Sequence, residues 1–197
     1  MKKKYSPYFV FYALSMLLCG FSFTANSQVI VPFKERTSSY SPIKTNYKIK
    51  GNFTMMGNTN LTLQNYDIHE TNGPNPMVYV DVDNDSQTIN SSSSTLDLPD
   101  DNGTKLTSCY TIVYAGLYWT GRVTDDAISP NSFDVTKNGI TTNLDKRKIL
   151  FKGPNENSYD EFTATEIHFP TNSDLNMYTA SAEVKDYVRK NGAGAHF

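Results

Sequence analysis

Cysteine is scarce in this chain of 197 residues, which contains only two. Cys19 lies in an amino-terminal segment that we expect to be removed, which leaves Cys109 as the single cysteine of the mature chain. One cysteine can build neither a disulfide framework nor a cysteine-based zinc site. Cys109 adjoins the most apolar stretch, so we expect it to be buried as a small hydrophobic residue, with pairing outside this segment as the alternative.

Catalytic motifs are also missing. The three histidines, His69, His168 and His196, form neither an HExxH motif nor a His-Cys pair. The sequence contains no GxSxG nucleophile elbow, no phosphate-binding glycine loop and no dinucleotide fingerprint. Adjacent acids such as Asp160-Glu161 are more often solvated surface than a catalytic pair. We therefore interpret the chain as not an enzyme.

An excess of basic residues is absent as well. The first 27 residues contain three lysines and no acids, so their removal leaves 15 Lys and Arg against 20 Asp and Glu. A net charge of about −5 argues against a nucleic-acid-binding protein, which would carry a basic patch.

The amino terminus has the pattern of a secretory signal peptide. MKKK is followed by the apolar run 8–25, and Ala25-Asn26-Ser27 offers small residues before a cleavage site at Gln28. The alternative is a membrane anchor, because the run is nearly long enough to span a bilayer. A lipoprotein at Cys19 is disfavoured by Leu18, which stands where a small residue is needed. We favour removal of residues 1–27 and a secreted or cell-surface location, with the membrane involved only during export.

The mature sequence is rich in Thr, Asn, Ser, Tyr, Val and Ile and reads as short strands between turns. The expected strands are 47–55 with Tyr47, Ile49, Phe53 and Met55 on one face, 61–63, 78–83 with the valines inward, the central strand 112–119 covered on both faces, 149–151, 162–169 and 178–184. In the stretch 182–192, Val184, Tyr187 and Val188 have helical spacing and Gly192 can end a helix.

These elements predict an all-β fold, an antiparallel β-sandwich of jelly-roll type with at most one short helix near 183–190. We divide the chain into a signal peptide, 1–27, an amino-terminal extension, 28–45, and a β-sandwich domain, 46–197. The sequence ends at GAGAHF without an expected closing strand, so we interpret the domain as truncated at its carboxyl end.

The stretch 78–88, VYVDVDNDSQT, is a candidate calcium loop because Asp81, Asp83 and Asp85 have the spacing of calcium ligands. An EF-hand loop also requires Gly at its sixth position and Glu at its twelfth, where this chain has Ser86 and Ser92. The alternative is a half-buried strand with Asp81 and Asp83 facing outward, followed by a turn. Calcium is thus the one cofactor that the sequence suggests, with acids of the segment 98–104 as further ligands.

Tyr118 and Trp119 are neighbours on an expected strand and therefore face opposite sides of a sheet. One of them belongs in the core, and the other is free to stack on a ligand such as a sugar or to pack beneath a second layer.

Four ordered segments resemble one protein family: 47–65, 77–98, 109–122 with the distinctive AGLYWTGR, and 178–194. The chain is similar to the amino-terminal domain of large cell-surface proteins of Bacteroidota, including gliding-motility adhesins. The resemblance implies a β-rich domain of a long protein that the type IX secretion system exports. It supplies no catalytic residues.

From these observations we expect a non-catalytic domain of a secreted surface adhesin, which serves display and attachment and acts in gliding motility. Its expected partner is a surface polysaccharide or another cell-surface component, not a nucleic acid. The alternatives are a carbohydrate-binding module assisted by calcium, and a hydrolase whose active site lies outside this sequence.

Overall fold

The computed structural model describes residues 35–67, 69, 75–99, 103, 110–122, 131–169 and 177–197. In this part the chain forms short strands and one short helix, and all the paired strands are antiparallel, which confirms the expected all-β character. The strands are β1 (Leu61–Leu63), β2 (Met77–Tyr79), β3 (Ser94–Leu96), β4 (Gly116–Arg122), β5 (Ser132–Lys137), β6 (Ile140–Asp145), β7 (Lys148–Phe151), β8 (Asp160–Thr163), β9 (Glu166–His168), β10 (Met177–Glu183) and β11 (Gly194–His196), and the helix is α2 (Lys185–Asn191). The signal peptide, Cys19 and Cys109 lie outside the described residues.

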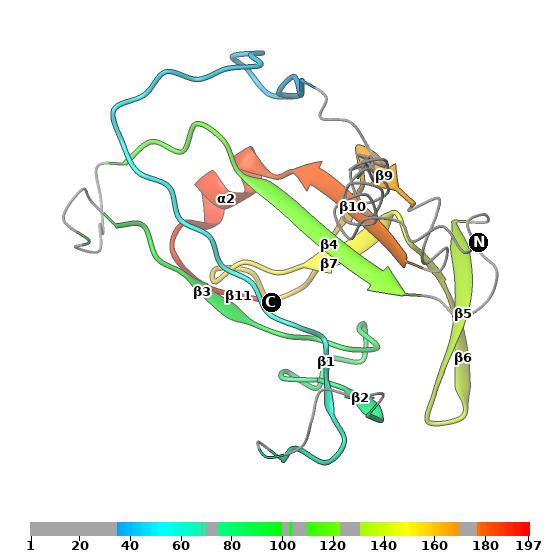
Figure 1. Ribbon diagram of the computed structural model, residues 1–197. Coiled ribbons are helices and arrows are strands. Elements are labelled where there is room, and N and C mark those ends of the chain that lie inside the picture. The colour runs from blue at the N-terminus through cyan, green and yellow to red at the C-terminus, as the bar shows by residue number, and fades with distance from the viewer. Residues whose placement is uncertain are drawn as a thin grey trace, which may run out of the picture. The chain divides into compact units, whose positions relative to one another are not determined.

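The largest sheet has the strand order β4-β10-β9. Figure 1 shows β4 and β10 side by side, with α2 directly after β10. Trp119, Ala180 and Ile167 form one row across the three strands, and Tyr118, Ser181 and Glu166 form the adjacent row. Because side chains alternate along a strand, the first row lies on an apolar face and the second on a polar face.

This sheet corrects the expectation of a central strand at 112–119. Within the described residues β10 is the central strand, and β4 lies on one side of it. Strand β4 begins only at Gly116, and its Tyr118 is 60% exposed, so the strand is not covered on both faces. Strand β10 takes the central place with the small, buried Ala180 and Ala182, which allow close packing.

The expected helix is confirmed as α2. Val184 is its N-cap residue and Val188 packs in the core with Val184 and Leu96. Gly192 follows the helix with φ 70°, and its backbone N–H donates to Val188 O at 2.8 Å. A positive φ is nearly free of strain only for glycine, so Gly192 ends the helix as the sequence predicted.

A second group of strands is joined through the last residues of the chain. Strand β11 pairs with β3, and β7 pairs with β8. Lys152 and Phe197 exchange backbone hydrogen bonds of 3.0 and 2.9 Å, which connects the end of β7 to the residue after β11. No strand was expected in GAGAHF, but Gly194–His196 forms one and pairs with β3. Truncation of the domain at its carboxyl end stays a prediction.

Aromatic side chains fasten α2 to the β7–β8 hairpin. The rings of Phe162 and Tyr187 lie 5.1 Å apart edge to face, and those of Phe151 and Tyr187 lie 5.5 Å apart. His196 is buried and stacks on Phe151 at 5.4 Å. Such contacts add to the free energy gained from burying the rings themselves.

The β5–β6 hairpin was not among the expected strands. Its turn is Asn138-Gly139, with φ 54° and 79°, which is the strongest short hairpin signal that a sequence offers. The dipeptide was present in the sequence, so this element was predictable and was missed.

The expected strand 47–55 was wrong. The segment is not paired as a strand with any of the described residues, and Phe53 and Met55 are 76% and 85% exposed. Its alternating pattern is that of a strand, but alternation alone supplies no partner for the backbone. The strand expected at 162–169 is divided into β8 and β9 at Ala164 and Thr165, whose N–H groups bond Arg147 O and Ser181 O.

The described part of the extension, from residue 35, is fastened to β10. Ser38 Oγ donates to Glu183 Oε1 at 2.7 Å, and the Ser39 N–H donates to Glu183 Oε2 at 2.8 Å. Lys185 Nζ donates to Ser41 O at 2.9 Å. Within the described residues, no helix has the length and apolar character needed to cross a membrane.

Candidate functional site

The stretch 78–88 has the opposite orientation to the one expected. Strand β2 ends at Tyr79, and Val82 is 45% exposed. The Asp83 side chain, in contrast, is only 13% exposed. The two faces of the stretch are therefore distinct, but the carboxylates of Asp81 and Asp83 face the protein. They do so because Lys137, Lys152 and Tyr159, from distant segments, form ion pairs and hydrogen bonds with them.

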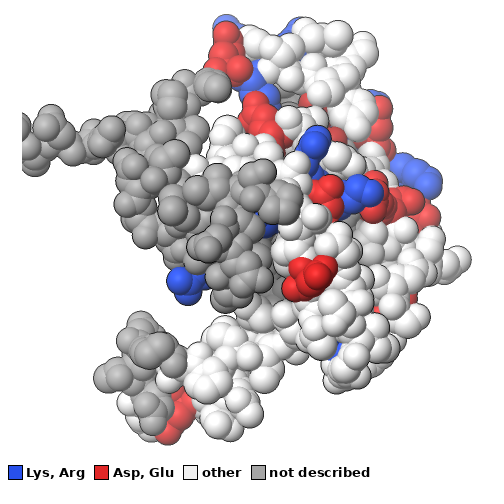
Figure 2. All heavy atoms as spheres, turned by 90° about the vertical axis from the view of Figure 1, so that its right-hand side faces the viewer, with Lys and Arg blue, Asp and Glu red and all other residues white. Residues whose placement is uncertain are grey.

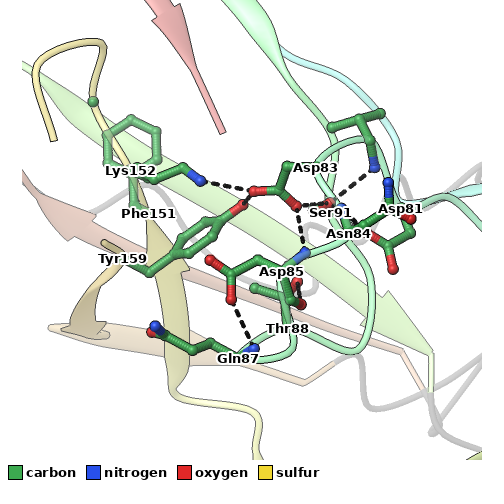
Figure 3. Close-up of polar contacts among 12 residues, drawn as sticks. Asp81, Asp83, Asn84, Asp85, Gln87, Thr88, Ser91, Phe151, Lys152 and Tyr159 are labelled. Atoms are coloured by element: carbon green, nitrogen blue, oxygen red, sulfur yellow. Dashed lines mark hydrogen bonds and ion pairs between the residues drawn. The ribbon is translucent and has the colours of Figure 1, made fainter. Parts of the chain in front are cut away.

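Asp83 is the centre of this arrangement (Figure 3). Its Oδ2 atom accepts hydrogen bonds from Lys152 Nζ at 2.8 Å and from the Tyr159 hydroxyl at 2.7 Å. Its Oδ1 atom accepts one from Ser91 Oγ at 2.8 Å. The loop is thereby tied to the β7–β8 hairpin, because Lys152 and Tyr159 lie between β7 and β8.

Burial alone would raise the pKa of Asp83, but the hydrogen bonds from Lys152, Tyr159 and Ser91 outweigh it and hold the pKa well below its usual range. Burial and the nearby Asp83 carboxylate raise the pKa of Tyr159, which stays protonated and keeps donating. Lys152 Nζ also lies 4.3 Å from the ring centre of Tyr159 and 4.9 Å from that of Phe197. The ammonium group is thus held by a carboxylate and two aromatic rings.

The other two aspartates have different partners. Asp81 Oδ2 accepts from Lys137 Nζ at 3.1 Å, and its Oδ1 accepts from the Asn84 N–H at 3.0 Å. Lys137 Nζ also donates to Ile89 O. The bond from Lys137 lowers the pKa of Asp81. Asp85 turns away and accepts the Gln87 N–H at 2.9 Å, as a turn-forming aspartate does.

Ser91 belongs to this network although the sequence analysis did not identify it. It is buried, and its hydroxyl lies 3.2 Å from Asp81 Oδ1 and 2.8 Å from Asp83 Oδ1. It also accepts the Val82 N–H at 3.0 Å. No local pattern marks this role, because the partners are eight to ten residues away.

The three aspartates supply oxygens, which are the ligands that calcium prefers. Among the described residues, no three His, Cys, Asp or Glu side chains gather into a group that could hold a metal ion. Lys137 and Lys152 already neutralise Asp81 and Asp83, so a cation would have to displace them. Asp100 and Asp101 of the segment 98–104 lie outside the described residues. Calcium binding at Asp81, Asp83 and Asp85 stays a prediction.

Tyr118 and Trp119 lie on opposite faces of β4, as their adjacency predicted. Trp119 is half-buried, and its indole N–H donates to Lys146 O at 2.9 Å. Tyr118 is the exposed member of the pair, on the polar face of the sheet. Of the two aromatic residues, Tyr118 is therefore the one available to a ligand.

A polar group surrounds Tyr118, and most of it escaped the sequence reasoning. Arg36 Nη1 donates to the hydroxyls of Tyr114 and Tyr118 at 3.1 and 3.0 Å, and Arg36 Nη2 donates to Glu166 Oε2 at 3.0 Å. The two tyrosine hydroxyls lie 2.8 Å apart. We call Arg36, Tyr114, Gly116, Tyr118 and Glu166 the tyrosine platform.

Charged groups are mixed over the surface. Figure 2 shows acidic and basic residues side by side on the face that it presents. The mixture agrees with ion pairs such as Lys148–Glu161 at 2.8 Å and Lys190–Glu156 at 2.6 Å. Exposed pairs of this kind contribute little to stability, because water and salt screen them.

The site therefore contains a carboxylate network around Asp83 and an exposed platform around Tyr118, both assembled from segments far apart in the sequence. Comparison of the chain with protein-family models, with curated proteins and with solved structures found no match.

Proposed function

We propose that this chain is a non-catalytic attachment and display domain of a secreted bacterial surface adhesin. The observation that carries the proposal is the polar, aromatic face of the β4-β10-β9 sheet, on which Tyr118 is open to solvent. An exposed aromatic residue among satisfied polar groups suits recognition of a ligand better than a chemical reaction. The signal-peptide pattern and the similarity of AGLYWTGR to Bacteroidota gliding-motility adhesins support export and a cell-surface location, with the type IX secretion system as the route.

We also propose that the two groups of strands form a β-sandwich of jelly-roll type. In support, the core cluster contains Leu96 from β3 and Val184 and Val188 around α2, and Leu117 from β4 and Phe162 from β8 pack against it. Residues of both groups thus share one apolar core, as the two sheets of a sandwich do.

Export can be tested with the full chain expressed in a Bacteroidota host. Antibody labelling of intact cells should detect the chain on the surface, and cells that carry it should adhere to polysaccharide-coated glass more strongly than cells without it. A chain lacking residues 1–27 is the control and should remain inside the cell. Retention of the full chain inside the cell would contradict the proposal.

The second candidate function is carbohydrate binding assisted by calcium. It is favoured by the position of the Asp81 and Asp83 carboxylates, each of which has one oxygen next to the same Ser91 hydroxyl. Calcium in the millimolar range should raise the melting temperature of the purified chain, as extracellular calcium sites bind in this range. The rise should vanish in an Asp81→Asn, Asp85→Asn double variant. An unchanged melting temperature in the wild type would exclude calcium.

A further inference from the structure

The ring of Tyr118 lies back over Gly116, two residues earlier on the same face of β4. A Cβ atom at Gly116 would lie 2.7 Å from Tyr118 Cε2 and 2.9 Å from the Tyr118 hydroxyl oxygen. Distances this short mean that a side chain at position 116 would have to displace the ring, so the ring occupies the place that a side chain would take. Part of the ring therefore rests against the strand, and Arg36 Cζ lies 5.5 Å from the ring centre. Tyr118 is nevertheless 60% exposed, so much of its surface is open to a ligand.

The hydroxyl end of the ring is fixed from two directions. Arg36 Nη1 bonds the hydroxyls of both Tyr114 and Tyr118, and Arg36 Nη2 bonds Glu166 Oε2 and, at 3.1 Å, Ser181 Oγ. All four of these N–H groups point at protein oxygens, so Arg36 acts as a positioning residue. An aromatic ring held in one orientation before binding loses little conformational entropy when a ligand arrives.

The platform retains hydrogen-bonding capacity for a ligand. Each tyrosine hydroxyl has one hydrogen, and both accept from Arg36. Because only one of the two hydrogens is used between Tyr114 and Tyr118, the other hydroxyl can donate outward. Glu166, whose side chain is 40% exposed, adds a carboxylate acceptor at the same edge.

The charges of the platform cancel. Arg36 and Glu166, the two charged residues of the platform, form an ion pair at 3.0 Å. The platform combines a flat apolar ring with a hydroxyl donor and a carboxylate acceptor, and it has no net charge. This combination suits a neutral sugar. A sugar ring presents an apolar C–H face to stack on the tyrosine and hydroxyl groups at its edge to bond the donor and acceptor. A polyanion finds no surplus of positive charge here, and the mature chain is acidic.

We propose that the tyrosine platform binds a neutral polysaccharide, with a sugar ring stacked on Tyr118 and sugar hydroxyls bonded to the Tyr114–Tyr118 pair and Glu166. The inference rests on the proposed attachment function and names the ligand class and the residues that contact it. Gly116 belongs to the site because its missing side chain makes room for the ring.

The test measures affinity of the purified full chain for soluble neutral polysaccharides (a β-glucan, a mannan and a galactan) and for alginate as an acidic one, by gel retardation and calorimetry. We expect a neutral polysaccharide to bind and alginate to bind more weakly or not at all. Tyr118→Ala should weaken binding about tenfold or more, since it removes the stacking surface. Tyr118→Phe keeps the ring and should lose only about two- to fivefold, for one hydrogen bond.

Two further variants separate binding from folding. Gly116→Ala retains Tyr118 but pushes its ring away, so it should weaken binding by a similar factor. Tyr79→Ala removes an exposed tyrosine from β2, in a different sheet, and is the matched control that should bind normally. Thermal melts of all variants establish that each is folded.

The inference is overturned if no neutral polysaccharide in the panel binds, if alginate binds more tightly than all of them, or if Tyr118→Ala binds as well as the wild type. These outcomes are distinct from a failure of export. A chain that reaches the cell surface and adheres without Tyr118 contradicts the platform alone, whereas a chain that binds sugar through Tyr118 but stays inside the cell contradicts the attachment function alone.

Discussion

Asp83 is held by Lys152 and Tyr159 from a distant part of the chain and by the nearby Ser91, so its replacement should destabilise the protein. In an Asp83→Asn variant the Lys152 ammonium group, only 14% exposed, would lose its charged partner. Breaking a mostly buried ion pair costs about 3 kcal/mol, at the low end of the range for fully buried pairs. Urea unfolding measures this loss. Lys148→Ala is the control in the same hairpin, because the Lys148–Glu161 pair is about half exposed, so water screens it and its loss should change stability much less.

The same carboxylate should govern stability in acid. The pKa of Asp83 is depressed in the folded protein, so its contribution to stability is present above the ordinary pKa of about 4 and is lost as the pH falls below it. Melting temperatures measured from pH 7 down to pH 2 should fall more steeply for the wild type than for Asp83→Asn. Parallel curves for the two proteins would show that Asp83 does not control the acid transition.

His196 should affect the stability of the protein at a higher pH than Asp83 does. Burial lowers its pKa, and the hydrogen bond with Gly194 O only partly opposes this. The neutral ring is thus favoured in the folded state, so stability is present above the ordinary pKa of about 6.5 and declines as the pH falls below it. His196→Phe keeps the stacking on Phe151 and removes a buried, unbonded Nε2 atom. Denaturant unfolding between pH 7 and pH 5 should show a decline for the wild type and little change for the variant.

At the scale of the element, the end of helix α2 depends on the backbone conformation of Gly192, the residue that follows the helix. Gly192 has φ 70°, which is strained for any residue with a Cβ atom. Gly192→Ala should lower the free energy of unfolding by about 1 kcal/mol, and more if the new methyl group disturbs the Tyr110 hydroxyl 3.1 Å away. Gly57→Ala is the control, since a Cβ there meets nothing within 4 Å. Equal stability of the two variants in urea would contradict the role of Gly192.

The elements also show what a local pattern is able to predict. The α2 helix and its end at Gly192 follow from spacing and from one residue type. The β5–β6 hairpin follows from Asn138-Gly139 in the same way. The segment 47–55 has an equally clear period of two but no strand pairing with the described residues, because a strand is completed only by a partner.

At the scale of the whole molecule, the exposed apolar side chains of 47–55 should make the isolated chain self-associate. Phe53 and Met55 lie on a segment of strand-like sequence with no strand partner among the described residues, which is the pattern of an aggregation-prone edge. A Phe53→Ser, Met55→Thr variant should elute closer to the monomer position in size-exclusion chromatography at high concentration. Its melting temperature should change little, since both side chains are already in water.

Thr54→Ser, between these two residues, is the matched control and should associate like the wild type. A loss of several degrees in the melting temperature of the double variant would contradict this prediction. It would mean that Phe53 and Met55 are buried in solution and that the segment pairs as a strand, as its sequence pattern predicts.

Some features of the candidate sites follow from neighbouring residues, and others depend on residues far away in the sequence. The sequence identified Asp81, Asp83 and Asp85 as a special group and Tyr118 and Trp119 as residues on opposite faces. It did not reveal that Asp81 and Asp83 face inward, nor that Arg36 from the extension fixes Tyr118. An alternation of valine and aspartate defines two faces of the segment but not which face is buried. Here the aspartate face is buried because Lys137, Lys152 and Tyr159 bind its carboxylates.

The sequence by itself determined the features that depend on neighbours a few residues apart: the strand-rich composition, the short helix and its glycine end, and the separation of Tyr118 from Trp119. Only the tertiary structure decided the rest. Lys152 is 69 residues from Asp83, and Arg36 is 130 residues from Glu166. Contacts between such distant residues form only when the chain between them is folded into a closed loop. The free energy that the contacts contribute must exceed the conformational entropy lost in closing that loop.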